Sequence, residues 1–262
     1  MRPTLTPKAA FLTTAMVFMA GVPTLQAGKP NAAADQDRRI EASAKGSYNF
    51  KTYLKDDDIR VASNGGVVTL TGSVSKEFHR LLAQETVAGL PGVKSVNNQL
   101  LVVGDQPPEH SDGWITMKVK TVLAFHSNVS ASGTEVHTEN GIVTLTGKAD
   151  SEAQSQLTCE YAKDVEGVTE VRNQLVVTKP AKPAERSVGE RVDDASITAQ
   201  IKSTLLFHRS THALATRVAT KNGVVTLHGE ARNASERDLV SRLAKDIKGV
   251  ERVNNLMTLQ KS

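Results

Sequence analysis

Three copies of one short apolar sequence constrain this chain more than any other feature. They read NGGVVTLTG at Asn64–Gly72, NGIVTLTG at Asn140–Gly147 and NGVVTLHG at Asn222–Gly229. Twenty residues after its last glycine, each copy reaches a second shared sequence, GVKSVNNQL, GVTEVRNQL or GVERVNNLM. The copies are separated by 75 and 82 residues. Self-similarity over such a long period is the signature of repeated structural units, so we expect three copies of one small domain.

These repeats divide the 262 residues into three predicted domains. The domains span residues 36–104, 111–178 and 192–260, and a Pro- and charge-rich linker at 179–191 precedes the third. Domains of this size bury only about 60% of the surface of the unfolded chain. Aromatic residues make up only 4% of the sequence. Each core should therefore be modest, without room for a deep substrate cavity.

The first 27 residues have the pattern of an export signal. Arg2 and Lys8 supply positive charge around the start of the chain, and an apolar run follows at Ala9–Ala20. The run is shorter than the roughly 20 residues that cross a bilayer. We expect residues 1–27 to be a signal peptide that is cleaved near Ala27, with an uncleaved membrane anchor as the alternative.

Charge is distributed unevenly along the mature chain. Removal of Arg2 and Lys8 lowers the formal net charge from +4 to +2, which gives no reason to expect a nucleic-acid partner. Residues 111–178 contain 5 Lys/Arg against 9 Asp/Glu, whereas residues 192–262 contain 11 against 7. Cys159 is the only cysteine, so it is either an unpaired residue or a thiol that pairs between chains.

The third domain shows the expected order of helices and strands. Ile197, Ile201 and Leu205 recur every four residues behind Asp193 and Asp194. This spacing predicts a helix with acidic residues at its N-terminus. The Asn-Gly pair further along predicts a hairpin with a type I′ turn, because both residues tolerate a positive φ. Apolar residues alternate with polar ones in the strand after the turn and should face the core.

A second helix should follow each hairpin. Its candidate N-caps are residue types that cap helices well: Ser75, Asp150 and Asn233. Its candidate C-terminal residues are glycines, which suit a left-handed C′ position: Gly92, Gly167 and Gly249. The strand–helix–strand crossover makes the last strand parallel to the strand before the helix, and such a crossover should be right-handed.

The predicted fold class is therefore α+β. We expect three tandem small αββαβ domains, each a three-stranded mixed sheet with two helices on one face. Helices packed on one face of a sheet form a two-layer core.

The sequence contains none of the motifs that carry common enzyme chemistry. A phosphate-binding glycine loop, a Gly-x-Ser-x-Gly elbow and a His-Glu-x-x-His motif are absent. His208 and His212 lie in a variable loop without a carboxylate or thiol ligand nearby in the sequence. The acidic run Asp56–Asp58 lacks the spacing of a calcium loop. We expect no enzyme activity, no catalytic residue, no metal site and no cofactor.

One helix face in the third domain is a candidate binding site. At about 100° per residue, Arg237, Ser241, Lys245 and Lys248 fall on one outward sector, with Arg242 beside them. Basic residues close to an anionic bilayer contribute about 1 kcal/mol each. The four basic residues Arg237, Arg242, Lys245 and Lys248 are therefore candidates for contact with phospholipid headgroups.

The rest of the same helix leaves a second interpretation open. Leu239, Leu243 and Ile247 point away from the basic sector and should face the core. Asp238 and Asp246 dilute the positive charge. An ordinary solvated helix face is therefore the alternative to a binding site.

Three segments of the third domain resemble a known family. The helix sequence DDASITAQIKSTLLF at Asp193–Phe207, the hairpin sequence NGVVTLHG and the ending GVERVNNLM are similar to the BON domain (bacterial OsmY and nodulation). All three domains share the resemblance, although Lys45–Tyr48 and Pro91 make the first less regular. It implies a periplasmic protein of the OsmY type, associated with osmotic and envelope stress. The residues that carry it form the fold, so it implies no catalytic residue.

The resemblance leaves two functions open. In the first, periplasmic BON domains bind an anionic phospholipid membrane surface, and the third domain contacts the headgroups. In the second, the chain is an OsmY-like chaperone whose small domains each bind unfolded exported proteins weakly, so that several contacts together give the affinity.

Overall fold

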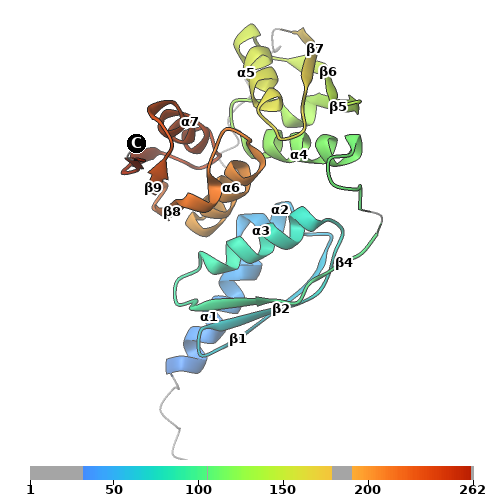
Figure 1. Ribbon diagram of the computed structural model, residues 1–262. Helices are drawn as coiled ribbons and strands as arrows, with labels where there is room; N and C mark the ends of the chain where they lie inside the picture. Colours follow the sequence, from blue (N-terminus) through green and yellow to red (C-terminus); the bar gives the residue numbers. More distant parts are fainter. Residues whose placement is uncertain (1–31, 105, 179–190, 261–262) are drawn as a thin grey trace, which may run out of the picture. The chain divides into compact units, whose positions relative to one another are not determined.

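Each repeat folds into a helical segment, an antiparallel pair of strands, a second helix and a last strand (Figure 1). The computed structural model describes residues 32–104, 106–178 and 191–260. In every repeat the last strand pairs in parallel with the second strand, which lies in the middle of a mixed sheet. The α+β prediction is confirmed. The predicted signal peptide and nearly all of the predicted linker lie outside the described residues.

The first repeat begins with two helices, of 15 and 5 residues, in place of one. Its elements are α1 (Ala32–Gly46), α2 (Tyr48–Thr52), β1 (Asp58–Asn64), β2 (Val67–Val74), α3 (Glu77–Ala88), β3 (Ser95–Asn98) and β4 (Leu101–Val102). The break falls at Ser47, whose side chain accepts a hydrogen bond from the Phe50 amide and so caps a new helix. This is the segment in which the sequence pattern is least regular.

The second and third repeats follow the same order, with one uninterrupted first helix of 14 residues each. The second repeat consists of α4 (Asp112–Phe125), the 3₁₀ turn η1 (Ala131–Gly133), β5 (Thr134–Glu139), β6 (Ile142–Ala149), α5 (Glu152–Lys163) and β7 (Glu170–Val177). The third consists of α6 (Asp194–Phe207), η2 (Ala213–Ala215), β8 (Thr216–Lys221), β9 (Val224–Ala231), α7 (Ala234–Lys245), β10 (Arg252–Asn255) and β11 (Thr258–Leu259). No described helix has the length and apolar character needed to cross a membrane.

An aspartate near the start of each first helix holds the hairpin turn. In the second repeat, Asn140 and Gly141 have φ values of 52° and 76°, as a type I′ turn requires. Both amides donate hydrogen bonds to the Asp112 carboxylate at 2.8 Å. Asp37 and Asp194 make the corresponding contacts in the other two repeats. The helix start and the turn of each repeat are thus tied together.

The predicted N-caps of the second helices are correct only in the third repeat, where Asn233 caps α7. Ser151, rather than Asp150, caps α5, because its hydroxyl accepts from the amide three residues further on at 3.1 Å. In the first repeat the cap position falls on Lys76 instead of Ser75, and no side-chain hydrogen bond caps α3.

The glycines expected to end the second helices lie three residues beyond the C-caps. The C-cap residues have a right-handed helical backbone conformation: Gly89, Asp164 and Asp246. The predicted glycines follow with φ values of 90°, 89° and 88°: Gly92, Gly167 and Gly249. A Cβ atom at Gly167 would meet the Ile115 side chain at 3.0 Å. Glycine is therefore needed by the turn before the last strand and not by the helix end.

An asparagine in each last strand ties the strand to the second helix. The side-chain amide of Asn98 donates to the carbonyl of Arg80 at 3.1 Å, and its Oδ1 accepts from the Leu100 amide at 3.2 Å. Asn173 and Asn255 make equivalent contacts in their repeats. Beside this asparagine the last strand is interrupted in the first and third repeats, which is why four strands replace the three predicted there.

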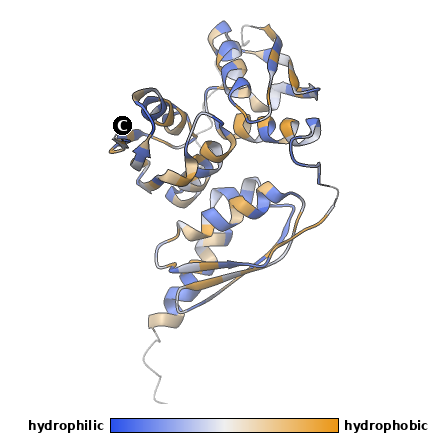
Figure 2. Cartoon of the chain, in the orientation of Figure 1, coloured by the Kyte–Doolittle hydropathy of each residue, from blue (hydrophilic) through white to orange (hydrophobic). Residues whose placement is uncertain are grey.

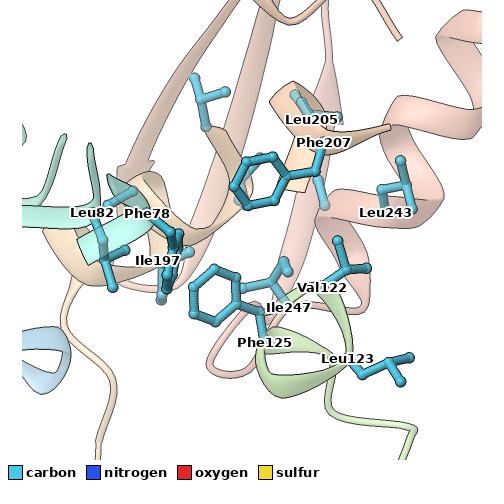
Figure 3. Packing of buried hydrophobic residues seen from close by; sticks show 14 of the residues in the cluster. Phe78, Leu82, Val122, Leu123, Phe125, Ile197, Leu205, Phe207, Leu243 and Ile247 are labelled. Carbon is cyan, nitrogen blue, oxygen red and sulfur yellow. The ribbon is translucent and has the colours of Figure 1, made fainter. Parts of the chain in front are cut away.

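The hydrophobic cores of the three repeats are continuous. Phe78 of α3, Phe125 of α4 and Phe207 of α6 meet, although each comes from a different repeat (Figure 3). The ring centroid of Phe78 lies 5.6 Å from that of Phe125 and 5.9 Å from that of Phe207. Both hydrophobic and hydrophilic residues occur along the helices (Figure 2), as expected for helices with one buried face. From Ala32 onward the chain is one compact unit.

Candidate functional site

A shallow groove with basic side chains lies between α7 and β10 in the third repeat. Its volume is about 280 Å³, and it is lined by Ser241, Arg242, Lys245, Glu251, Arg252 and Val253. Arg242, Lys245 and Arg252 are exposed, and we refer to these three residues as the basic surface. The helix-face pattern missed Arg252, because this residue belongs to β10 and reaches α7 only through the packing of the strand beside the helix.

The other two candidate residues lie outside this groove. Arg237 is half-buried near the start of α7, with its Nε 3.8 Å from a carboxylate oxygen of Asp238. Lys248 follows the end of α7, where it is half-buried and its amide donates to the carbonyl of Phe125 at 3.2 Å. The structure therefore brings Arg242 and Lys245 together with Arg252.

The buried side of α7 is centred slightly differently from the predicted apolar stripe. Leu243 and Ile247 are buried as expected, but Val240 is fully buried whereas Leu239 is only partly buried. Ser241, expected on the outward sector, accepts a hydrogen bond from Asn255 at 2.7 Å and so faces the last strand.

Asp246 does not dilute the positive charge at the exposed surface as the sequence suggested. Asp246 is only 7% exposed. Its carboxylate accepts hydrogen bonds from His126 Nδ1 at 3.1 Å, from the Tyr161 hydroxyl at 2.7 Å and from the Asn128 amide. All three donors belong to the second repeat. Asp238, by contrast, is exposed, so only one of the two acids on the helix remains at the surface.

The second and third repeats contact each other through reciprocal pairs. His126 at the end of α4 bonds to Asp246, and His208 at the equivalent end of α6 bonds to Asp164 at 2.8 Å. The backbone repeats the exchange, since the amide two residues after each aspartate donates across the contact: Glu166 to the Phe207 carbonyl and Lys248 to the Phe125 carbonyl. The two repeats are thus related by approximately two-fold contacts.

The reciprocal pairs have an electrostatic consequence. Burial lowers the pKa of His126, although the Asp246 carboxylate opposes this shift. The His126 ring stacks on Tyr161 with centroids 3.9 Å apart. Burial alone would raise the pKa of Asp164, but hydrogen bonds from His208 and Ser210 hold it below its usual value. Because burial lowers the pKa of His126 below the usual value of about 6.5, its ring is neutral near pH 7.

The first repeat has no counterpart of these pairs. Lys51 and Gly89 occupy the positions of the histidine and the aspartate. Both residue types stand at matching positions in the other two repeats, so their shared register was the signal available in the sequence. That register does not say that each histidine pairs with the aspartate of the other repeat.

The described residues show no arrangement for metal or thiol chemistry. Within this part of the chain, no group of three or more His, Cys, Asp or Glu side chains is placed to hold a metal ion. Cys159 is half-buried, and burial raises the pKa of its thiol, which disfavours the reactive thiolate. The predicted absence of a cofactor and of catalysis stays a prediction.

Three curated proteins each align with slightly more than half of this chain. The chain is 37% identical over 144 residues to Osmotically-inducible protein Y of Escherichia coli, covering 55% of this chain and 70% of that protein. It is 34% identical over 150 residues to a 21 kDa hemolysin of Actinobacillus pleuropneumoniae, covering 54% and 75%. It is 29% identical over 143 residues to the outer membrane lipoprotein DolP of Haemophilus influenzae, covering 54% and 71%.

Solved structures are more distant. The C-terminal domain of CdsD, a structural protein of the Type III secretion system of Chlamydia trachomatis, is 18% identical with a TM-score of 0.23, and the match covers 87% of this chain and 98% of that one. So low a TM-score carries no argument about function.

The family comparison covers the chain most fully. The BON domain matches residues 36–104, 111–179 and 193–261, one match for each repeat. BON-domain proteins of the OsmY type are generally non-catalytic. The sequence resemblance is confirmed: this chain belongs to the BON-domain family and contains three BON domains.

Proposed function

We propose that this protein binds anionic phospholipid surfaces of the cell envelope through its third BON domain. The observation that carries the proposal is the basic surface, in which Arg242, Lys245 and Arg252 surround a groove that can admit a headgroup. The burial of Asp246 supports it, because this carboxylate, which directly follows Lys245, is directed into the contact with the second repeat.

The expected affinity is low and depends on salt. Three basic residues at about 1 kcal/mol each give a few kcal/mol, and Glu251 in the same groove offsets part of this. Exposed charges are screened within about 8 Å at physiological ionic strength. Binding should therefore be reversible and responsive to the fraction of anionic lipid.

Family membership supports a location in the envelope. One relative is described as an outer membrane lipoprotein and another as osmotically inducible. We infer that the present chain is exported to the periplasm after cleavage near Ala27 and acts under osmotic or envelope stress.

Co-sedimentation with vesicles tests the site. The chain should sediment with phosphatidylglycerol vesicles and remain in solution with phosphatidylcholine vesicles. The triple variant Arg242→Ala, Lys245→Ala and Arg252→Ala should lose most of this binding. The matched control also removes three exposed basic residues, Lys148→Ala of β6 with Arg217→Ala and Lys221→Ala of β8, and should retain binding. Equal binding by the triple variant and the control would reject the assignment of the site.

One observation favours the chaperone as a second candidate. Each repeat exposes apolar side chains in or beside its last strand, with exposed fractions of 69% for Leu101, 60% for Val176 and 58% for Leu256. Exposed apolar residues repeated along one chain could bind several segments of an unfolded protein weakly. Substoichiometric protein should then delay the aggregation of an unfolded exported protein, and no delay at a several-fold excess would exclude this function.

A further inference from the structure

A second groove lies between the start of α3 and α4, away from the residues of the basic surface. Its volume is about 460 Å³, within the range of about 300–1,000 Å³ that is usual for small-molecule sites. Gln106 holds the connecting segment against one end, because its side chain accepts from the Glu77 amide at 3.4 Å and donates to the Ser75 carbonyl at 3.0 Å. The groove is therefore built from the first two repeats and the segment that joins them.

The inner surface of this groove is apolar. Tyr53, Phe78 and Met117 contribute to its lining, and Phe125 lies fully buried behind them. The Tyr53 ring packs edge-on against Phe125 with centroids 5.0 Å apart. The Tyr53 hydroxyl donates to the Ala124 carbonyl at 3.1 Å, and burial raises the pKa of this phenol well above its usual value. Tyr53 thus stays neutral and presents mainly its ring, so the inner surface suits a hydrocarbon chain.

The rim of the groove is basic. Lys76 and Lys120 line it and are exposed, and neither forms an ion pair with a described residue. His79 lines it too, with Nδ1 held by Asp57 at 2.5 Å. The Asp57 side chain is only 3% exposed and does not line the groove. Since no Asp or Glu is among the lining residues, the local field favours an anion.

We propose that this groove binds a small amphipathic anion, with one hydrocarbon chain on the aromatic surface and a carboxylate or phosphate head beside Lys76 and Lys120. An apolar interior with a few charged groups at the edge is the usual composition of a small-molecule site. The apolar side chains that line this groove suit a single hydrocarbon chain, whereas the groove of the basic surface is lined mostly by charged and polar side chains. The inference thus goes beyond the proposed function and concerns other residues.

Methyl NMR of the full chain tests this site without vesicles. The sequence contains five methionines, and the Met117→Leu variant assigns the signal of the groove. Octanoate and octyl phosphate should each shift the Met117 methyl signal saturably, and their affinities report which head is preferred. Met257, buried in the third repeat, is an internal control and should not shift. Absence of a saturable shift with both anions would overturn the proposal.

Two further comparisons test the chemistry of recognition. Octanol has the same chain without the charge and should bind at least about tenfold more weakly, a difference of about 1.4 kcal/mol. Inorganic phosphate lacks the chain and should leave the Met117 signal unchanged. Equal binding of octanol, or binding of phosphate alone, would overturn the combined recognition of chain and head.

Charge reversal identifies the residues that hold the head. Lys76→Glu and Lys120→Glu should each weaken octanoate binding at least about fivefold, since each replaces attraction by repulsion. Lys148→Glu makes the same change at an exposed position of β6 outside the groove and should bind as the unaltered chain does. Circular dichroism confirms that the variants fold. Equal effects of all three variants would show only a general charge effect and would overturn the site.

Discussion

A single asparagine joins the last strand to the second helix in every repeat. In the first repeat, Asn98 satisfies the carbonyl of Arg80 and the amide of Leu100 with one side chain. The neighbouring residue Asn97 is exposed on the same strand and forms no side-chain hydrogen bond within the described chain. Comparing substitutions at Asn98 and Asn97 therefore separates the stability that the hydrogen bonds contribute from the effect of removing an asparagine.

Asn98→Ala should lower the free energy of unfolding by about 1–3 kcal/mol, because it leaves partly buried backbone groups without their partner. Asn97→Ala should change it by less than about 0.5 kcal/mol, as surface substitutions usually do. Urea unfolding measures both values. Similar losses for the two variants would contradict the role assigned to Asn98.

Between elements, the reciprocal histidine–aspartate pairs are the most distinctive contact. The ends of α4 and α6 each place a buried histidine against the residue that follows the second helix of the other repeat. Around His126 lie Asp246, Tyr161 and, further off, His208, and burial among these groups lowers the pKa of His126. This contact depends on pH because one of its groups is buried in its neutral form.

Stability should fall as the pH drops below about 6.5, the usual pKa of histidine. Since the pKa of His126 is lowered in the folded chain, the unfolded chain binds more protons in the interval between the two pKa values. The midpoint of urea unfolding should therefore decrease between about pH 7.5 and about pH 5.5. His126→Gln should reduce this slope, and an unchanged slope in the variant would contradict the assignment.

In the whole molecule, the three BON domains share one core instead of forming three independent units. Phe125 is fully buried and contacts aromatic rings of the first repeat, and its backbone bonds to the third. Domains that share a core of this kind should unfold together.

Scanning calorimetry should accordingly show one main transition for the chain. Phe125→Ala should destabilise it by about 3–5 kcal/mol, as large-to-small changes of core phenylalanines do, and should move the whole transition. Separate transitions in the unaltered chain, with only one displaced by the substitution, would show that the repeats are independent.

The order of elements was predictable because its signals are local. The Asn-Gly turn at Asn140 and the stripe of Ile197, Ile201 and Leu205 each act within a few residues. In the second repeat the predicted cap is wrong by one residue because two capping types, Asp150 and Ser151, stand side by side. Such a choice depends on which side-chain oxygen accepts from the amide three residues further on, a geometric detail that residue type alone does not report.

The candidate site was less predictable, because it depends on contacts between distant segments. The sequence predicts Asp246 to be a surface charge, but residues of the second repeat, about 85 to 120 positions away in the chain, bury it. Arg252 could not be grouped with Arg242 by helix periodicity, since it lies on a strand. Helix periodicity in the sequence predicts the face of α7, but it does not predict which residues of that region contact another repeat.

The dependence of vesicle binding on salt tests the central claim most directly. Partition onto phosphatidylglycerol vesicles should be measured for the unaltered chain and for the triple variant of Arg242, Lys245 and Arg252 between about 0.05 and about 0.5 M salt, where the Debye length shrinks to about 4 Å. We predict strong binding of the unaltered chain at low salt, which converges at high salt on the weak binding of the variant. Binding that is insensitive to salt, or equal for the two proteins at low salt, would contradict the proposed function.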